Sequence, residues 1–369
     1  MNNYKLRELL TIHNGRDYRQ LHKGKIPVYG TGGIMTHVDS AIYNGEAILL
    51  PRKGTLDNIL YVSGEFWTVD TMYWAVTNPK LVNTKYLFYY LSLLDLSSKD
   101  TGSALPSMTQ DTYYSLDIEL PSLAYQEKIA NAISNIDSKI ANNNAISKEL
   151  EAMAKTIYDY WFLQFEFPDK DGKPYKSNGG KMIWNDQFKQ EIPEGWEVAV
   201  INNILGKYPK TKTVESKNYN QGTKYPIIDQ SKDSYICGYT NDEEKVLKLS
   251  NAIVFGDHSN KSKYVNFPFA RGADGTQIIS SNNLRLPNYL LYQEIISLPE
   301  IEKGYSRHFK FLKMQNIIIP SLNISKKYMD LVDDMLNKQK QIILENKQLK
   351  SLRDFLLPLL MNGQVTIEG

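Results

Sequence analysis

One order of elements occurs twice in this sequence, and that repeat limits the possible folds more than any other feature. A turn-rich block ends at Pro121 and is followed by a helix-like stretch, and a second block ends at Pro320 before another such stretch. These two prolines lie 199 residues apart, as do Pro27 and Pro226 in the earlier part of each block. A fixed order of elements at one period indicates two copies of a single module.

The two blocks, residues 1–121 and 196–320, have the patterns of mixed α and β structure. Short apolar runs such as AILLP (47–51) and AIVFG (252–256), bounded by Gly, Asn and Pro, predict strands. One amphipathic helix is expected in each block, near TKYLFYYLSLL and PNYLLYQEII. We therefore assign the chain to the α+β class with two globular domains, whose strand order the sequence leaves open.

Residues 122–164 and 321–362 are expected to form long helices, joined through a linker at 165–195 that is rich in Gly, Pro, Asp and Lys. Each helix of about 40 residues would span roughly 60 Å. The apolar stripes could pack on each helix's own domain, but their length favours pairing of the two helices. The residues expected on this seam are Ile129, Ile133, Ile136, Ile140, Leu150, Met153, Ile157, Val332, Met335, Ile342, Leu349, Leu352 and Leu356.

Asn144 and Asn346 interrupt the two stripes at the same point of the repeat. A buried Asn in such a seam fixes the register of the helices at some cost in stability. The pattern predicts an antiparallel coiled coil under a pseudo-twofold axis, separating the two globular domains.

Length and composition narrow the class of protein further. A chain of 369 residues with 42% hydrophobic and 23% charged residues fits several globular domains. No apolar run approaches the roughly 20 residues that span a membrane, and the N-terminus does not resemble a signal peptide. Cys237 is the lone cysteine, so we expect no disulfide framework. Together these features predict a protein with no membrane partner and a cytoplasmic location.

The basic residues are clustered although the formal net charge is only +2. Residues 207–224 and 303–313 each carry a local charge of +4. Clusters of this kind suit surfaces that face phosphate groups. Solvated loops are the alternative for any single cluster.

The sequence contains only weak signals for a catalytic site. The YGTGG sequence at 29–33 could suggest a cofactor loop, but the chain has no Pro-Pro pair to build a methyltransferase motif. Asp229, Glu243 and Lys245 loosely resemble a magnesium nuclease site, a pattern that is common by chance. The five histidines lack the spacing of metal ligands. We therefore expect no catalytic residue and no metal ligand in this chain.

Several motifs resemble the specificity subunit of type I restriction–modification systems. In the first block these are IPVYGTGGI (26–34), AILLPRKG (47–54), FWTVDTMY (66–73) and the stretch from GSALPSM to IANAI (102–133). In the linker, FEFPDKDGKPYKSNGGKMIW followed by IPEGWEV is the most specific piece, and residues 253–279 resemble another recognition-domain variant. The second block departs from the first, with IDQSKDSY in place of YGTGGI and GDHSNK in place of RKG.

The resemblance implies a DNA reader without catalysis of its own. Two target-recognition domains on a helical spacer would read two short sequences in double-stranded DNA, separated by bases that they ignore. Two methyltransferase (modification) subunits would dock on the helices and use S-adenosylmethionine. Two restriction/translocase subunits would add cleavage that depends on ATP and Mg²⁺, so this chain would bind none of these cofactors.

We expect the following residues to contact phosphates or bases: Lys25, Thr31, Arg52, Lys53, Ser103 and Ser107 in the first module, and Lys210, Lys212, His258, Lys261, Lys263, Arg271, Arg307 and Lys310 in the second. An exposed charge without a partner is the alternative for each of them. His258 could equally stabilise its own loop by a hydrogen bond.

Two other functions remain open at this point. The chain could be a DNA-cleaving or DNA-methylating enzyme in its own right, which predicts turnover by the isolated chain. It could also be a coiled-coil adaptor with no role on nucleic acid. An adaptor predicts partner binding that is insensitive to salt, whereas phosphate contacts weaken steeply as salt rises.

Overall fold

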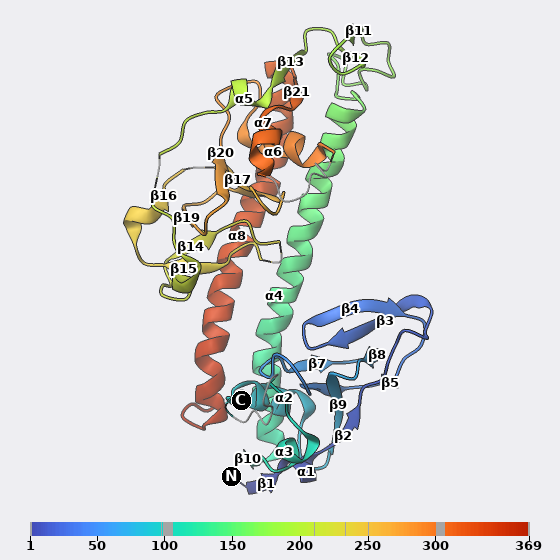
Figure 1. The fold of residues 1–369 in the computed structure, drawn as a ribbon, viewed down its shortest axis with the longest axis vertical. Helices are drawn as coiled ribbons and strands as arrows, with labels where there is room; N and C mark the ends of the chain where they lie inside the picture. The colour runs from blue at the N-terminus through green and yellow to red at the C-terminus, as the bar shows by residue number, and fades with distance from the viewer. Residues whose placement is uncertain are drawn as a thin grey trace. The chain divides into compact units, whose positions relative to one another are not determined.

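The computed structural model describes residues 2–96, 98, 106–209, 211–232, 234–249, 251–299 and 307–367. These residues form two compact units, with residues 1–142 and 346–369 in unit 1 and residues 143–345 in unit 2. Each unit holds one strand-rich module and part of both long helices, α4 (Leu123–Tyr158) and α8 (Leu322–Met361). Figure 1 draws α4 in green and α8 in red.

The described residues of the unit 1 module form two four-stranded sheets and three short helices. Its sheets have the strand orders β2-β9-β6-β7 and β4-β3-β8-β5, and β1 pairs separately with β10. The elements are β1 (Asn2–Lys5), α1 (Leu6–Leu9), β2 (Leu10–Asn14), β3 (Lys23–Gly30), β4 (Gly33–Val38), β5 (Tyr43–Asn44), β6 (Ala47–Pro51), β7 (Leu60–Val62), β8 (Glu65–Thr68), β9 (Met72–Thr77), α2 (Thr84–Ser92), α3 (Gln110–Tyr114) and β10 (Asp117–Leu120).

Unit 2 repeats this order after the linker. Its sheets are β15-β14-β19-β16, β18-β17-β20, the pair β13-β21 and the linker hairpin β11-β12. The elements are β11 (Met182–Asn185), β12 (Gln190–Pro193), β13 (Glu197–Val200), α5 (Ile201–Ile204), β14 (Tyr225–Ile228), β15 (Gly238–Thr240), β16 (Val246–Leu247), β17 (Ala252–Gly256), β18 (Ser262–Val265), β19 (Phe269–Arg271), β20 (Thr276–Ile279), α6 (Asn288–Ser297), α7 (His308–Lys313) and β21 (Asn316–Ile319).

The internal repeat is confirmed by matching backbone hydrogen bonds. In unit 1 the amide of Leu6, at the start of α1, donates to the carbonyl of Leu116 at 2.9 Å. In unit 2 the amide of Ile201, at the start of α5, donates to the carbonyl of Gln315, also at 2.9 Å. Each module also has one parallel strand pair, β3 with β8 and β14 with β19. The two modules are therefore built on the same frame.

The apolar runs form the central strands because neither of their faces meets water. All five residues of β6 and all five of β17 are buried. The two amphipathic helices expected from the sequence are α2 and α6, and the Asn83 side chain caps α2 by accepting a hydrogen bond from the amide of Tyr86. The short helices α1, α3, α5 and α7 had no sequence signal of their own, since four to six residues are too few to show a helical period.

Within unit 1 the two long helices pack against each other and against their module. Ile129 and Ile133 of α4 share one buried cluster with Leu357 and Leu360 of α8 and with strands and helices of the module. Lower-numbered residues of α4 meet higher-numbered residues of α8, which is the antiparallel order. The seam therefore serves the helix pair and the module core together.

The same antiparallel order holds within unit 2. The Tyr328 hydroxyl of α8 donates to the carbonyl of Ala154 on α4 at 3.2 Å. Further along, the Gln339 side chain donates to the carbonyl of Ser147 at 2.9 Å. No helix in the described part of the chain combines the length and the apolar character that a membrane crossing requires.

The prediction that Met153 and Leu352 lie on the seam was wrong. Met153 and Leu352 are 52% and 46% exposed, because the buried stripe of each helix runs one or more positions away, through residues such as Ala154 and Leu357. Ile129, Ile133, Ile140, Val332 and Ile342 are buried, and Ile136, Leu150, Ile157, Met335, Leu349 and Leu356 are partly buried.

The polar break of α4 also lies one residue earlier than expected. Asn144 is exposed, whereas Asn143 is 2% exposed and its side chain donates to the Glu345 carboxylate at 2.9 Å. Asn346 is 9% exposed, as the sequence predicted for a polar residue in the seam.

Candidate nucleic-acid interface

The loop that follows β6 is the centre of a cluster of predicted contact residues in unit 1. The Arg52 amide donates to the carbonyl of Thr71 at 2.8 Å, and the Arg52 carbonyl accepts from the amide of Met108 at 3.0 Å. Next to it, Lys53 forms an antiparallel bridge with Ser107. Because these bonds are between backbone groups, they hold the loop in place whatever side chains it carries.

Thr31 joins the same cluster from the turn between β3 and β4. The Asn58 side chain donates a short hydrogen bond to the carbonyl of Thr31. A Cβ atom placed on Gly54 would lie 3.4 Å from the Thr31 hydroxyl oxygen, so the two loops touch there. Thr31, Arg52, Lys53 and Ser107 are thus brought together. Lys25 is not part of this cluster. It lies near the start of β3, six residues before Thr31, which is roughly 20 Å along an extended strand.

The two basic side chains of this cluster, Arg52 and Lys53, differ in how far protein contacts hold them in place. The Arg52 guanidinium lies over the ring of Tyr73 at 5.9 Å and donates to the carbonyl of Asp70 at 3.4 Å. Burial raises the pKa of the Tyr73 hydroxyl, although the nearby Arg52 charge opposes the change. The Lys53 side chain is exposed, which leaves its ammonium group better placed to meet a phosphate.

Unit 2 repeats this frame with a different residue at its centre. The Asp257 amide donates to the carbonyl of Gly275 at 2.8 Å, and the Asp257 carbonyl accepts from the amide of His308 at 2.9 Å. Asp257 therefore takes the place of Arg52. Its buried carboxylate accepts from the Phe309 amide at 2.8 Å and anchors the first turn of α7.

His258 follows Asp257 and belongs to this second cluster. Its amide donates to the Gln230 side chain at 3.1 Å, and Gln230 in turn donates to the carbonyl of Asp274 at 2.9 Å. A Cβ atom on Gly275 would come within 2.6 Å of the imidazole, so the ring lies against that glycine. Arg307 and Lys310, at the start of α7, are joined to the same loop through the Asp257 contacts and are exposed, as is Lys261.

Arg271 and Lys212 lie together at the end of β19. The Arg271 guanidinium donates to the carbonyl of Thr211 at 3.3 Å, and Val214 pairs in parallel with Gly272. Lys212 is exposed beside this contact. Two predicted residues, Ser103 and Lys210, lie outside the described residues.

Lys263 is placed differently from the other predicted lysines. Its ammonium donates to the carbonyl of Ser234 at 2.6 Å. Burial lowers the pKa of this ammonium, although Cys237 and Asp229 nearby oppose the change. The side chain holds the loop after β14, which gives it less freedom to meet DNA.

Asp229, Glu243 and Lys245, the residues of the alternative nuclease site, form hydrogen bonds and ion pairs with neighbouring side chains. Asp229 accepts from the Tyr219 hydroxyl, the Cys237 thiol and the Ser231 amide, each at 2.8 Å. Burial opposes its ionisation, but these hydrogen bonds together keep its pKa below the usual value.

Glu243 pairs with Lys248 at 2.7 Å and Lys245 pairs with Asp242 at 3.3 Å. The described residues contain no group of three or more His, Cys, Asp or Glu side chains that could hold a metal ion. The arrangement of these residues thus supports structural roles for them.

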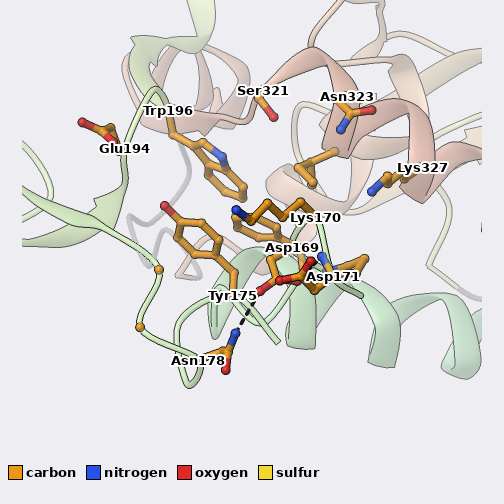
Figure 2. A pocket seen from close by; sticks show the side chains of 15 residues that line it. Asp169, Lys170, Asp171, Tyr175, Asn178, Glu194, Trp196, Ser321, Asn323 and Lys327 are labelled. Atoms are coloured by element: carbon orange, nitrogen blue, oxygen red, sulfur yellow. Dashed lines mark hydrogen bonds between the residues drawn. The ribbon is translucent and has the colours of Figure 1, made fainter. Parts of the chain in front are cut away.

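The linker forms a hollow of about 560 Å³ with the start of α8, shown in Figure 2. Phe167 stacks between Tyr175 at 4.6 Å and Trp196 at 5.0 Å, which gives the hollow an aromatic wall. The Asp169 carboxylate on its rim accepts from the Asp171 and Lys173 amides and from Asn178, whose bond is dashed in Figure 2. The Asp169 contacts hold the linker in shape, and the stack of Phe167 on Trp196 joins it to the start of the second module.

Sequence reasoning missed the residues that position the two clusters. Asn58 and Gln230 each tie one loop to another, yet an isolated amide side chain in a polar loop carries no periodic signal. Asp257 was missed for the same reason. Only the alignment of the two repeats, which places GDHSNK against PRKG, could have indicated its position.

Comparison with known proteins agrees with the resemblance. A family model described as type I restriction modification DNA specificity domain matches residues 1–152. The chain is 30% identical over 316 residues to the type I restriction enzyme MjaIX specificity subunit of Methanocaldococcus jannaschii, covering 78% of this chain and 70% of that protein.

A more distant relative and a solved structure extend this comparison. The HindI specificity subunit of Haemophilus influenzae is 24% identical over 204 residues, 54% of this chain and 40% of that subunit. The crystal structure of the type I restriction-modification S subunit from M. genitalium aligns with a TM-score of 0.59 at 15% identity, covering 97% and 95% of the two chains. That likeness supports the fold.

Proposed function

This chain belongs to the family of type I restriction–modification specificity subunits, and from that premise we propose that each module reads one half of a bipartite sequence in double-stranded DNA. The observation that carries the proposal is the shared frame with Arg52 at one centre and Asp257 at the other. The Asp257 carboxylate is buried and anchors α7, whereas the Arg52 guanidinium lies over the ring of Tyr73, so the similar frames carry different side chains around their centres.

Phosphate contacts would position each module, and base contacts in the grooves would give the specificity. The exposed lysines and arginines around the two loops suit the first task. They are Lys53 in unit 1 and Lys261, Arg307 and Lys310 in unit 2. Neutralising phosphates in this way makes affinity fall steeply as salt rises.

The helices would serve as the spacer and as the docking surface for modification subunits. On α4 and the π-helical turn that follows it, Ile146, Met153, Tyr160 and Leu163 are between 41% and 52% exposed and are spaced by seven, seven and three residues. This spacing places them on one face of the helix. On α8, Leu352 and Phe355 are 46% and 65% exposed and lie three residues apart. An apolar stripe of this kind fits a helix of another protein.

Catalysis would then belong to the partner subunits. Two modification subunits would supply S-adenosylmethionine chemistry, and two restriction subunits would supply the reactions that use ATP and Mg²⁺. The engagement of Asp229, Glu243 and Lys245 in local contacts supports this division. The chain would act on chromosomal DNA in the cytoplasm.

Exchange of one module tests the proposal. A chimera that carries residues 196–320 of a related subunit should, when expressed with its modification subunits, change one half of the methylated sequence and leave the other half intact. A change in both halves, or in neither, would contradict the proposal. As a second arm, the purified chain incubated with Mg²⁺ or with labelled S-adenosylmethionine should neither cleave nor methylate DNA.

A further inference from the structure

The ribbon formed by β3 and β4 in unit 1 carries two large apolar side chains in water. Ile34 is 56% exposed and Met35 is 57% exposed, both at the start of β4. We infer that these two side chains contact the bases of the first half-site and determine which bases it accepts. The inference rests on the proposed function, because it names the residues through which the first module would read its sequence.

Met35 is set apart from its neighbours by a β-bulge. Val28 pairs with Thr36 and the next residue, Tyr29, pairs with Ile34, so Met35 has no partner on β3. A bulge of this kind turns a side chain away from the regular alternation of the strand. Here it allows Ile34 and Met35, which are adjacent in sequence, both to be exposed.

The turn before these residues is narrow and open. A Cβ atom on Gly32 or Gly33 would meet nothing within 4 Å, and Gly33 has a φ of +104°, which other residues rarely adopt. A Cβ atom on Gly30 would come within 2.5 Å of the Met35 sulfur, so that glycine makes room for the methionine. The backbone can thus approach a ligand closely with the apolar side chains in front.

The surroundings of the turn favour DNA as the occupant. The turn is tied through Thr31 to the loop that carries Arg52 and Lys53. Between Asp17 and Asp39 the sequence has no acidic residue, whereas Lys23 and Lys25 are exposed on β3. A positively charged, two-stranded ribbon fits the major groove, which is about 12 Å wide. An apolar side chain there contacts the methyl group of thymine.

Among its described residues, the loop that joins β14 and β15 in unit 2 has no large apolar side chain exposed as Ile34 and Met35 are. In the loop that joins β14 and β15, the described residues 229–232 and 234–237 are held by three hydrogen bonds to the Asp229 carboxylate and by the contact of Lys263 with Ser234. Tyr235 of this loop donates to the carbonyl of Tyr264. The two modules therefore differ at this ribbon, as two readers of unlike half-sites should.

The test uses the full chain assembled with its modification subunits. The methylated sequence of the wild-type complex is first mapped, and the variants Ile34→Ala and Met35→Ala are mapped in the same way. Each thymine of the first half-site is then replaced by deoxyuridine, which lacks the methyl group. Leu93→Ala, which removes a 43% exposed side chain of the same unit away from the ribbon, is the matched control.

We expect the ribbon variants to accept more sequences in the first half-site while the second half-site stays unchanged. At one thymine or more, deoxyuridine should weaken wild-type binding about fourfold, the loss expected for one methyl-sized apolar group. The variant that lost the contact should be insensitive to the same replacement, and Leu93→Ala should behave as the wild type.

Three results would overturn the inference. The first is unchanged specificity in both ribbon variants. The second is a first half-site in which no deoxyuridine replacement weakens binding. The third is a failure of the variants to bind the modification subunits, which would make the ribbon a protein interface. None of these results affects the proposed function, which is tested separately by the bipartite target of the wild-type complex and by the module exchange.

Discussion

Arg353 of α8 donates from its guanidinium to the Asp137 carboxylate of α4 at 2.9 Å, within unit 1. The second oxygen of that carboxylate accepts from the Tyr89 hydroxyl of α2 at 2.6 Å. One half-buried carboxylate therefore joins both long helices to the first module. The contact shows that the helix pair is part of the core of the unit, and the stability of the pair should depend on it.

Asp137→Ala should destabilise unit 1. The change leaves the Arg353 and Tyr89 donors without this acceptor, and loss of hydrogen bonds to a charged group costs about 1.5–3 kcal/mol. Urea unfolding, followed by the fluorescence of the first module, should report a loss of this size. Ser138→Ala, at the exposed neighbouring position, should change the unfolding midpoint little.

Glu294 of α6 should make the stability of unit 2 depend on pH. Burial raises the pKa of its carboxyl from the ordinary 4.5 to about 7. The folded chain therefore keeps a proton that the unfolded chain releases, and the free energy of unfolding falls as the pH rises from 4.5 to about 7.

Glu294→Gln should remove this pH dependence and stabilise the protein at pH 8 by about 1–3 kcal/mol. Unfolding curves of both proteins at pH 5 and pH 8 provide the measurement. Parallel losses of stability in the variant and the wild type over that range would show that another group is responsible.

Lys53 and Lys263 should affect DNA binding differently although both were predicted contacts. Lys53 is exposed beside the unit 1 loop, so Lys53→Ala should reduce the slope of log affinity against log salt by about 0.9. Lys263 is engaged with Ser234, so Lys263→Met should leave that slope unchanged even if it loosens the loop. Affinities of the assembled complex for a target duplex at several salt concentrations would separate the two.

Met153 should matter for assembly although it is not a seam residue. Because its side chain is 52% exposed on the apolar stripe of α4, Met153→Asp should weaken recruitment of modification subunits tenfold or more, an order-of-magnitude expectation for a charge placed in an apolar contact. Ala152→Asp places the same charge about 100° around the helix and serves as the control. Equal effects of the two changes in a pull-down titration would argue against the stripe as the docking face.

The sequence predicted the elements whose signals are long. The stripes of α4 and α8 extend over enough residues to show a helical period, and β6 and β17 are continuous apolar runs bounded by turn residues. The repeat indicated the order of these elements. The sequence predicted less accurately which residues of each helix face the seam. Met153 was assigned to the seam in place of Ala154 because a large apolar residue resembles a core residue, yet Ala154 is the one that packs closely beneath Tyr328.

The candidate site was less predictable because it is made of loops. Lys53 and Ser107 are brought together by a backbone bridge between segments more than fifty residues apart, which no local pattern encodes. Lys263 has the composition of a contact residue but is turned to a backbone carbonyl. The bulge that exposes Met35 depends on the register of two strands, which the sequence does not state.

If the paired helices set the distance between the two half-sites, longer helices should move the half-sites apart. Seven residues inserted in α4 after Asn142 and seven in α8 after Glu345 keep the seam in phase and lengthen each helix by about 10 Å. At about 3.4 Å per base pair, the methylated sequence should keep both half-sites and gain about three base pairs between them. Methylation mapping that finds both half-sites at their original spacing would show that the helices do not set this distance.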